Sequence, residues 1–196
     1  ARVPVVTVDR TLPGLPFDHV GVDNVRAAYG AVEHLITEGH VRIGHLTQEA
    51  PASTVAERRT GYEQALRDHG LQVHEEDVIV WRNSASERAK LCHHLLSRTD
   101  RPTALFCVND YIAVELLLLL QDFGARIPQD IALVGFDDAR ESTLVRPALT
   151  TVAQPLNAIG QSAARLLLDR CSGRTTGPPV EIILATELIV RESSVR

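Results

Sequence analysis

Long apolar runs are missing from this sequence of 196 residues. Its longest unbroken apolar stretches, such as Leu116–Leu120, fall far short of the roughly 20 residues that a membrane-spanning helix needs. The chain also opens without the pattern of a signal peptide, because residues 1–9 lead directly into a strand-like pattern. We therefore predict no association with a membrane.

The sequence also lacks an excess of basic residues, and its number of cysteines is not even. The net charge is −5, which argues against direct binding of nucleic acid, because a phosphate backbone favours a basic face. The cysteines, Cys92, Cys107 and Cys171, are odd in number, widely spaced and set among apolar residues. This pattern is typical of buried, reduced thiols, so we expect a cytoplasmic protein.

The motifs of common catalytic and metal sites are absent. The sequence has no GxSxG, HExxH, CxxC, P-loop or glycine-rich dinucleotide turn. His93 and His94 have no companion at metal-ligand spacing. Asp137 and Asp138 could be imagined as an acid pair for hydrolysis, but adjacent loop residues rarely converge on one atom. We therefore predict neither an enzyme nor a resident metal or cofactor.

Residues 103–138 contain a strand pattern, a helix pattern and a second strand pattern. Apolar runs at 103–108 and 131–136 flank a helix that Asn109 can cap and that Gly124 ends. Such a βαβ unit places its two strands parallel to each other. Asn109 and Asp137 each follow the end of a strand, which is the edge where ligands bind in open parallel sheets.

The rest of the chain also alternates between strands and helices. Strands are expected at 3–8, 41–46, 77–81, 149–153 and 180–190. Helices are expected to begin near Asp23, Thr54, Ser84 or Ser86, and Pro155. Thr54 and Glu57 have the form of a capping box. The pattern predicts an α/β fold with mostly parallel sheets, in which the helix after Pro155 needs a sheet face of its own.

Four segments carry a resemblance to a known family. They are VEHLITEGHVRIGHL at 32–46, ERRTGYEQALRDHG at 57–70, RPTALFCVNDYIAVELLLLLQDFGARIPQDIALVGFDD at 101–138 and PALTTVAQPLNAIGQSAARLLLD at 147–169. In their order and spacing they resemble the effector-binding domain of the LacI/GalR family of bacterial transcription regulators. The combination of GHVRIGHL, VGFDD and LTTVAQP is much more specific than any single βαβ unit.

The resemblance implies a two-lobed, periplasmic-binding-protein-like fold whose small-molecule effector binds between the lobes. The chain would cross between lobes near 39–42, 150–154 and 184–187. We expect residues 1–40 and 155–182 in the N-terminal lobe, and residues 41–154 and 183–196 in the C-terminal lobe. Family members begin with a helix-turn-helix headpiece, a hinge and the start of the first lobe. We therefore expect the first lobe to be incomplete here and the headpiece to be absent.

The resemblance also implies residues that bind the effector from the helix side. Arg58 matches the family's effector-binding arginine, whose guanidinium suits sugar hydroxyls, a purine or a carboxylate. A lone helix arginine is more often a solvated charge, and Arg59 points elsewhere on the helix. Thr54 matches a position that can touch the effector, but a capping role would explain it too. Asp23 is a possible contact that a helix cap explains equally well.

Other implied contacts lie at strand ends. Asn109 matches the asparagine of the family's ND motif, with an N-cap as the alternative. Asp137, from the GFDD segment, is the best single candidate, because a carboxylate at a strand end can accept hydrogen bonds from two hydroxyl groups. Gln154 corresponds to a cleft position on a crossing strand.

One position departs from the family pattern. Family members often place an aromatic ring against the ligand, and the alignment puts Asn83 at or near that position. Trp81 lies two residues earlier, on the same side of an extended chain. Trp81 either supplies the ring from a shifted register or belongs to the core, so the class of ligand stays open.

The function expected from this resemblance is effector sensing in a homodimeric regulator. The effector would be a sugar or a nucleobase-like metabolite, and operator DNA would bind only to the headpiece. The effector shifts the balance between two lobe arrangements by its difference in affinity for them. The alternative is the periplasmic sugar-binding protein of a transporter, which has the same two-lobed fold.

Overall fold

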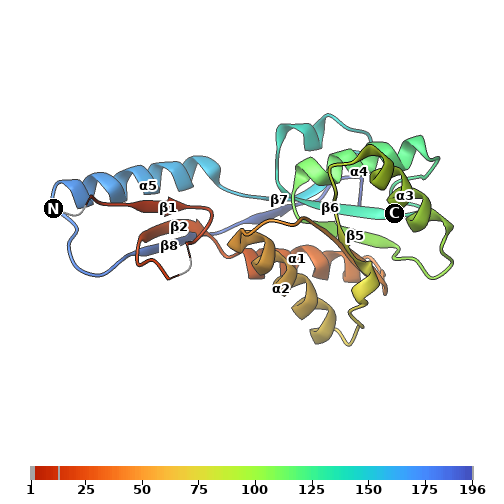
Figure 1. The fold of residues 1–196 in the computed structure, drawn as a ribbon, viewed down its shortest axis with the longest axis horizontal. Helices are drawn as coiled ribbons and strands as arrows, with labels where there is room; N and C mark the ends of the chain where they lie inside the picture. The colour runs from red at the N-terminus through yellow and green to blue at the C-terminus, as the bar shows by residue number, and fades with distance from the viewer. Residues whose placement is uncertain (1–2, 13, 196) are drawn as a thin grey trace.

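The computed structural model describes residues 3–12 and 14–195, which form two bodies joined by extended segments (Figure 1). The smaller body holds a parallel sheet of three strands in the order β1-β2-β8. These strands are Val6–Val8, Asp18–Val22 and Glu181–Leu184. One face of this sheet is covered by α5 (Leu156–Cys171), which packs Ile159, Ala163 and Leu166 against Val20 and Val22.

The larger body is built on a sheet of six strands in the order β4-β3-β5-β6-β7-β9. In that order the strands are Val78–Val80, Ile43–Thr47, Ala104–Cys107, Ala132–Asp137, Thr150–Ala153 and Glu187–Ile189. All neighbouring pairs are parallel except β7 and β9. The central strands are buried almost throughout, as expected for a parallel sheet that is covered on both faces.

Helices cover both faces of the larger sheet. On one face lie α1 (Asn24–Thr37) and α2 (Ser53–Asp68), and on the other lie α3 (Ala85–Ser97) and α4 (Asp110–Asp122). Short 3₁₀ helices are η1 (Glu75–Asp77) and η2 (Arg140–Thr143). Each face therefore has its own hydrophobic core, one containing Phe106 and Tyr62 and the other containing Leu116 and Trp81.

The βαβ unit expected at 103–138 is confirmed as β5, α4 and β6. The side chain of Asn109 caps α4 by accepting a hydrogen bond from the amide of Ile112 at 2.9 Å. Gly124 ends the helix with a φ of 84°, a conformation that favours glycine. The fold class, α/β with mostly parallel sheets, is also as predicted.

One predicted crossing between the bodies is wrong. The chain crosses at 22–24 rather than at 39–42, because α1 packs Ala28, Val32 and Leu35 into the core of the larger sheet. Residues 24–37 therefore belong with the larger body and not with the first lobe, as Figure 1 also shows. The other two crossings, after β7 and between β8 and β9, lie near the expected positions. Residues 1, 2, 13 and 196 of the predicted lobes lie outside the described part of the chain.

Two strand predictions near the chain ends need correction. The run at 3–8 forms a strand only at 6–8, and Val3 is 83% exposed rather than buried. The strand β2 was not predicted, because Asp18, His19 and Gly21 interrupt its apolar pattern. The run at 180–190 is two strands in two different sheets.

Among the described residues, no helix has both the length and the apolar character to cross a bilayer.

Gly61 allows α1 and α2 to approach closely. A Cβ atom at this position would overlap the backbone oxygen of Val25 and lie 2.9 Å from the Cβ of Ala28. We predict that Gly61→Ala lowers the free energy of unfolding by about 1–3 kcal/mol, because it overpacks this interface. Urea denaturation measures the change. Gly160→Ala, in open space on α5, is the control and should raise stability by about 0.5–1 kcal/mol; equal effects of both variants would contradict the close approach.

Candidate functional site

Arg58 is a buried cation at the carboxyl edge of the larger sheet. It is 5% exposed and lies on α2. Its Nη1 donates a hydrogen bond to the backbone oxygen of Val108 at 2.6 Å, and its Nε donates to Oδ1 of Asn24 at 3.0 Å. The guanidinium carbon lies 3.6 Å from the ring centre of Phe136. Groups from α1, from the residue after β5 and from β6 therefore hold this side chain of α2 in one position.

Asp137 faces Arg58 from the end of β6. Its Oδ1 lies 3.5 Å from Nη2 of Arg58 and accepts a hydrogen bond from Nε2 of Gln154 at 2.9 Å. The backbone of Asp137 has a φ of 114°, which is uncommon for a residue other than glycine. The structure thus brings together three of the residues singled out in the sequence: Arg58, Asp137 and Gln154.

Burial and the neighbouring charges shift the pKa values of this cluster in opposite directions. Burial raises the pKa of the Asp137 carboxyl group, while the charge of Arg58 and the hydrogen bond from Gln154 lower it. Burial also lowers the pKa of Arg58, and the charge of Asp137 opposes that change. Arg59 points away from the cluster, as predicted, and pairs with Glu63 at 2.8 Å.

The smaller body presents polar groups to the same place. Asp9, which follows β1 with a φ of 64°, acts electrostatically on both Arg58 and Asp137. The amide of Thr11 donates to Oγ of Ser53 at the start of α2, at 3.1 Å. Next to this contact lies a cavity of about 250 Å³ whose walls come from both bodies and include Asp9 and Asn24. The cluster and this cavity therefore lie where the two bodies meet.

Two acceptor atoms of this region have no hydrogen-bond partner among the described residues. They are Oδ1 of Asp9 and Oε1 of Gln154, and both are buried. An unpaired buried acceptor costs free energy, so a donor from a bound molecule would stabilise the site.

Thr54 does not cap α2 as predicted. The helix begins at Ser53 after Ala52, and no side chain caps it. Thr54 is therefore the second helical residue and is 4% exposed. Glu57 does not reach back to the helix start, because its Oε2 accepts a hydrogen bond from Nδ2 of Asn24 at 2.9 Å. A contact with α1 thus replaces the predicted capping box.

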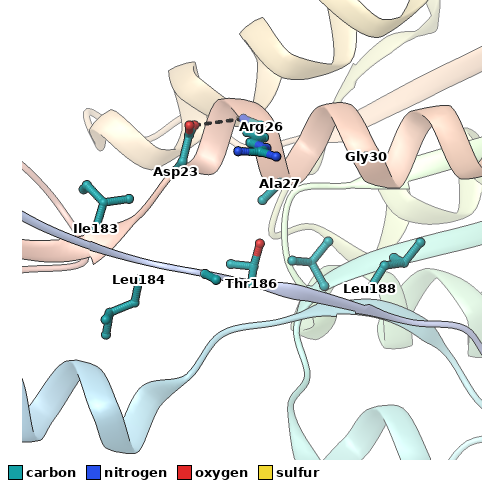
Figure 2. A pocket seen from close by; sticks show the side chains of 10 residues that line it. Asp23, Arg26, Ala27, Gly30, Ile183, Leu184, Thr186 and Leu188 are labelled. Atoms are coloured by element: carbon teal, nitrogen blue, oxygen red, sulfur yellow. Dashed lines mark hydrogen bonds between the residues drawn. The ribbon is translucent and has the colours of Figure 1, made fainter.

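Asp23 and Asn109 both act as helix caps, the alternatives that the sequence left open. The carboxylate of Asp23 accepts a hydrogen bond from the amide of Arg26 at 2.9 Å. Asp23 also lines a cavity of about 480 Å³ between α1 and the segment that joins β8 to β9. Thr186, in that segment, lines the same cavity (Figure 2). Asn109 follows β5, the strand next to β6, so it lies at the same edge as Asp137.

Trp81 and Asn83 lie farther along that edge. Trp81 follows β4, which is three strands from β6, or about 14 Å at the usual strand spacing. Trp81 belongs to the core, is 8% exposed and donates through Nε1 to Glu115 at 3.2 Å. Asn83 accepts a hydrogen bond from Arg88 at 2.8 Å. These contacts account for both side chains within the larger body itself.

Sequence reasoning missed several residues of the cluster. Asn24 joins Arg58 to Glu57, and nothing in its sequence position signals this role. Asp9 could have been found, because it follows a strand just as Asn109 and Asp137 do. No group of three or more His, Cys, Asp or Glu side chains that could hold a metal ion occurs among the described residues.

Comparison with known proteins shows the family to which this chain belongs. Residues 32–194 match the sequence model of the periplasmic binding protein-like domain. The chain is 35% identical over 98% of its length to the transcriptional regulator CelR of Thermobifida fusca, and 34% identical over 97% to the repressor CytR of Escherichia coli. It spans only 57% and 56% of those two proteins.

Solved structures give the same result. The chain is similar to a complex of CelR with cellobiose, at 34% identity and a TM-score of 0.85, covering 96% of this chain and 58% of the other. It is also similar to a LacI-family regulator from Enterococcus faecium with bound ribose, at 29% identity and a TM-score of 0.85, covering 98% and 70%.

We predict that Arg58→Gln raises the pKa of the Asp137 carboxyl group further above its usual value. The reason is that Arg58 lowers this pKa while burial raises it. Carboxyl carbon shifts followed by NMR through a pH titration measure the change. Arg59→Gln is the matched control, because Arg59 pairs with Glu63 instead, and it should leave the titration of Asp137 unchanged. An unchanged titration in Arg58→Gln would show that the two groups do not interact.

Proposed function

Since this chain belongs to the periplasmic binding protein-like family, and its relatives are LacI-family transcriptional regulators, we propose that it senses a small effector between its two bodies. The observation that carries the proposal is the buried Arg58 facing Asp137 and Gln154, with Asp9 opposite on the smaller body. Effector binding would change the preferred arrangement of the bodies by its differential affinity for them. Binding of operator DNA would then belong to a headpiece outside these 196 residues.

The chemistry of the cluster favours a polyhydroxylated effector. Asp137 and the unpaired oxygens of Asp9 and Gln154 can accept hydrogen bonds from hydroxyl groups, while Arg58 offers donors in a planar fork. We propose a sugar or a related metabolite on these grounds, and the sugars named with two relatives, cellobiose and ribose, are the first to test.

Other roles receive less support. A periplasmic transport protein would have a similar fold, but the relatives reported above are regulators. The same relatives favour a binding role over a catalytic one. A cytoplasmic location belongs to the proposed role in gene regulation.

We predict that a bound sugar stabilises the protein through Arg58 and Asp137. At a concentration of 100 times Kd, the melting temperature should rise by about 5–10 °C, because ligand binding at this level adds about 2.7 kcal/mol. Differential scanning fluorimetry with cellobiose, ribose, other sugars and nucleobases measures this rise. Arg58→Ala and Asp137→Ala should abolish the rise, while Arg59→Ala should keep it. An undiminished ligand response in both site variants would overturn the assignment.

We also propose that the protein forms a homodimer through the outer face of α4. Tyr111 and Leu118 lie two turns apart on one side of this helix and are 69% and 49% exposed. Leu144, at the end of the neighbouring η2, is 62% exposed. A second copy of the chain is the proposed partner, because a twofold axis beside this face would pair each apolar patch with its equivalent.

We predict that Leu118→Glu weakens the dimer at least tenfold, because a charge would be buried at its centre. Sedimentation equilibrium measures the dissociation constant. Leu168→Glu on α5 is the matched control, since Leu168 is also exposed, at 63%, and it should leave the dimer intact. A monomeric wild-type protein, or equal dissociation of both variants, would contradict this interface.

A further inference from the structure

Asp110 is a buried carboxyl group that lies directly beneath the turn bearing Asp137. It is the first residue of α4 and is 1% exposed. Its Oδ1 accepts a hydrogen bond from Oγ1 of Thr151 at 2.6 Å, and its Oδ2 accepts one from the amide of Ala139 at 2.8 Å. One carboxyl group thus joins the start of α4 to β7 and to the end of the turn at 137–139.

That turn has a backbone conformation that needs support. Asp137 and Asp138 have φ values of 114° and 52°, where residues other than glycine are uncommon and strained. Asp138 is held by Nη2 of Arg191 at 2.6 Å, and Ala139 is held by Asp110. These two contacts fix the residues that follow Asp137, while Gln154 and Arg58 hold its carboxylate directly.

The carboxyl group of Asp110 occupies space next to Gly135 that a larger residue at position 135 would fill. A Cβ atom at this position would overlap Oδ1 of Asp110 and lie 3.0 Å from Cδ2 of Leu149. Gly135 is inside β6, where glycine weakens a strand and often marks the close approach of another group. The glycine and the carboxyl group therefore form one arrangement.

We propose that Asp110 is a positioning residue of the effector site, which fixes the 137–139 turn so that Asp137 faces both Arg58 and the bound molecule. This inference rests on the proposed function for the role of Asp137, but the contact with Ala139 can be tested without any effector. Asp110 acts through the turn and does not itself touch the effector.

The surroundings of Asp110 keep it uncharged over part of the pH range. Burial raises its pKa to about 7, and the nearby carboxylates of Asp137 on β6 and Asp138 in the turn act in the same direction, against the hydrogen bonds from Thr151 and Ala139. On β5, the thiol of Cys107 is buried beside it and has a raised pKa. Because the pKa is higher in the folded state, the stability that this group contributes is greatest in acid and is lost as the pH rises from about 4 to 7.

The test compares Asp110→Ala, Asp110→Asn and Gly135→Ala in the intact protein. Hydrogen exchange at the amide of Ala139, followed by NMR, should become at least tenfold faster in Asp110→Ala and in Gly135→Ala. Affinity for cellobiose or ribose, whichever binds the wild type, should fall at least tenfold by calorimetry in the same two variants. Asp110→Asn should restore both readouts to within about threefold, because its amide oxygen can accept from Ala139 and its NH₂ group can donate to Thr151.

A pH series tests the ionisation of Asp110 separately from its contact with Ala139. The stability of Asp110→Asn relative to wild type should increase from pH 5 to pH 8, because the variant lacks the group that loses its contribution in this range. A constant difference in stability across this range would overturn the assigned ionisation.

Asp77→Ala is the matched control. Asp77 is also a fully buried aspartate, but it pairs with Arg42 and Arg98 at the other end of the sheet. The control should lose stability while its folded form keeps wild-type affinity. Wild-type exchange at Ala139 in Asp110→Ala would overturn the proposal, as would an equal loss of affinity in Asp77→Ala. If neither sugar binds the wild type, that result counts against those sugars as effectors, and exchange at Ala139 still decides the role of Asp110.

Discussion

The arrangement of the larger body depends on a buried charge that must be satisfied from several directions at once. A guanidinium removed from water is costly unless hydrogen bonds and a counter-charge replace its hydration. Arg58 obtains these from Asn24 on α1, from the carbonyl of Val108 after β5 and from Asp137 at the end of β6. A shift of any of these elements would leave the charge unpaired, so α1, α2 and the sheet edge are fixed relative to one another.

The polar groups of the site differ in how completely their hydrogen bonds are satisfied. Arg58 has enough partners within the larger body to remain buried, whereas Asp9 and Gln154 each keep an acceptor without a partner among the described residues. The first group therefore forms a rigid base, and the second keeps two acceptor atoms that a donor from another molecule would satisfy. A ligand that donated to both acceptors would contact the two bodies together, which is the physical requirement for coupling its binding to their arrangement.

The sequence was informative wherever local chemistry decided the structure. Residues at the ends of parallel strands, Asn109 and Asp137, and the stop at Gly124 could be found because strand order and helix caps follow from short patterns. Prediction from the sequence failed where contacts between residues far apart in the chain determined the structure. The assignment of α1 to the first lobe was wrong because its apolar face does not reveal which sheet it covers, and the capping box was wrong because Asn24 binds Glu57. Asp9 was overlooked, since residues at strand ends were considered only in the unit at 103–138. Asp110 lies in that unit, but it was overlooked because the preceding residue, Asn109, is the one at the strand end.

The contrast between Asp137 and Asp110 shows how two neighbouring carboxyl groups can serve one site differently. Asp137 is partly exposed and faces Arg58, so its negative charge has a partner and can also meet a ligand. A second full charge at Asp110 would repel it across a short distance in a poorly solvated region. Burial favours the neutral form of Asp110, whose carbonyl oxygen can still accept from Ala139 and whose O–H can donate to Thr151. Asp110 therefore supports Asp137 rigidly. In its neutral form, it does not compete with Asp137 for the positive charge of Arg58.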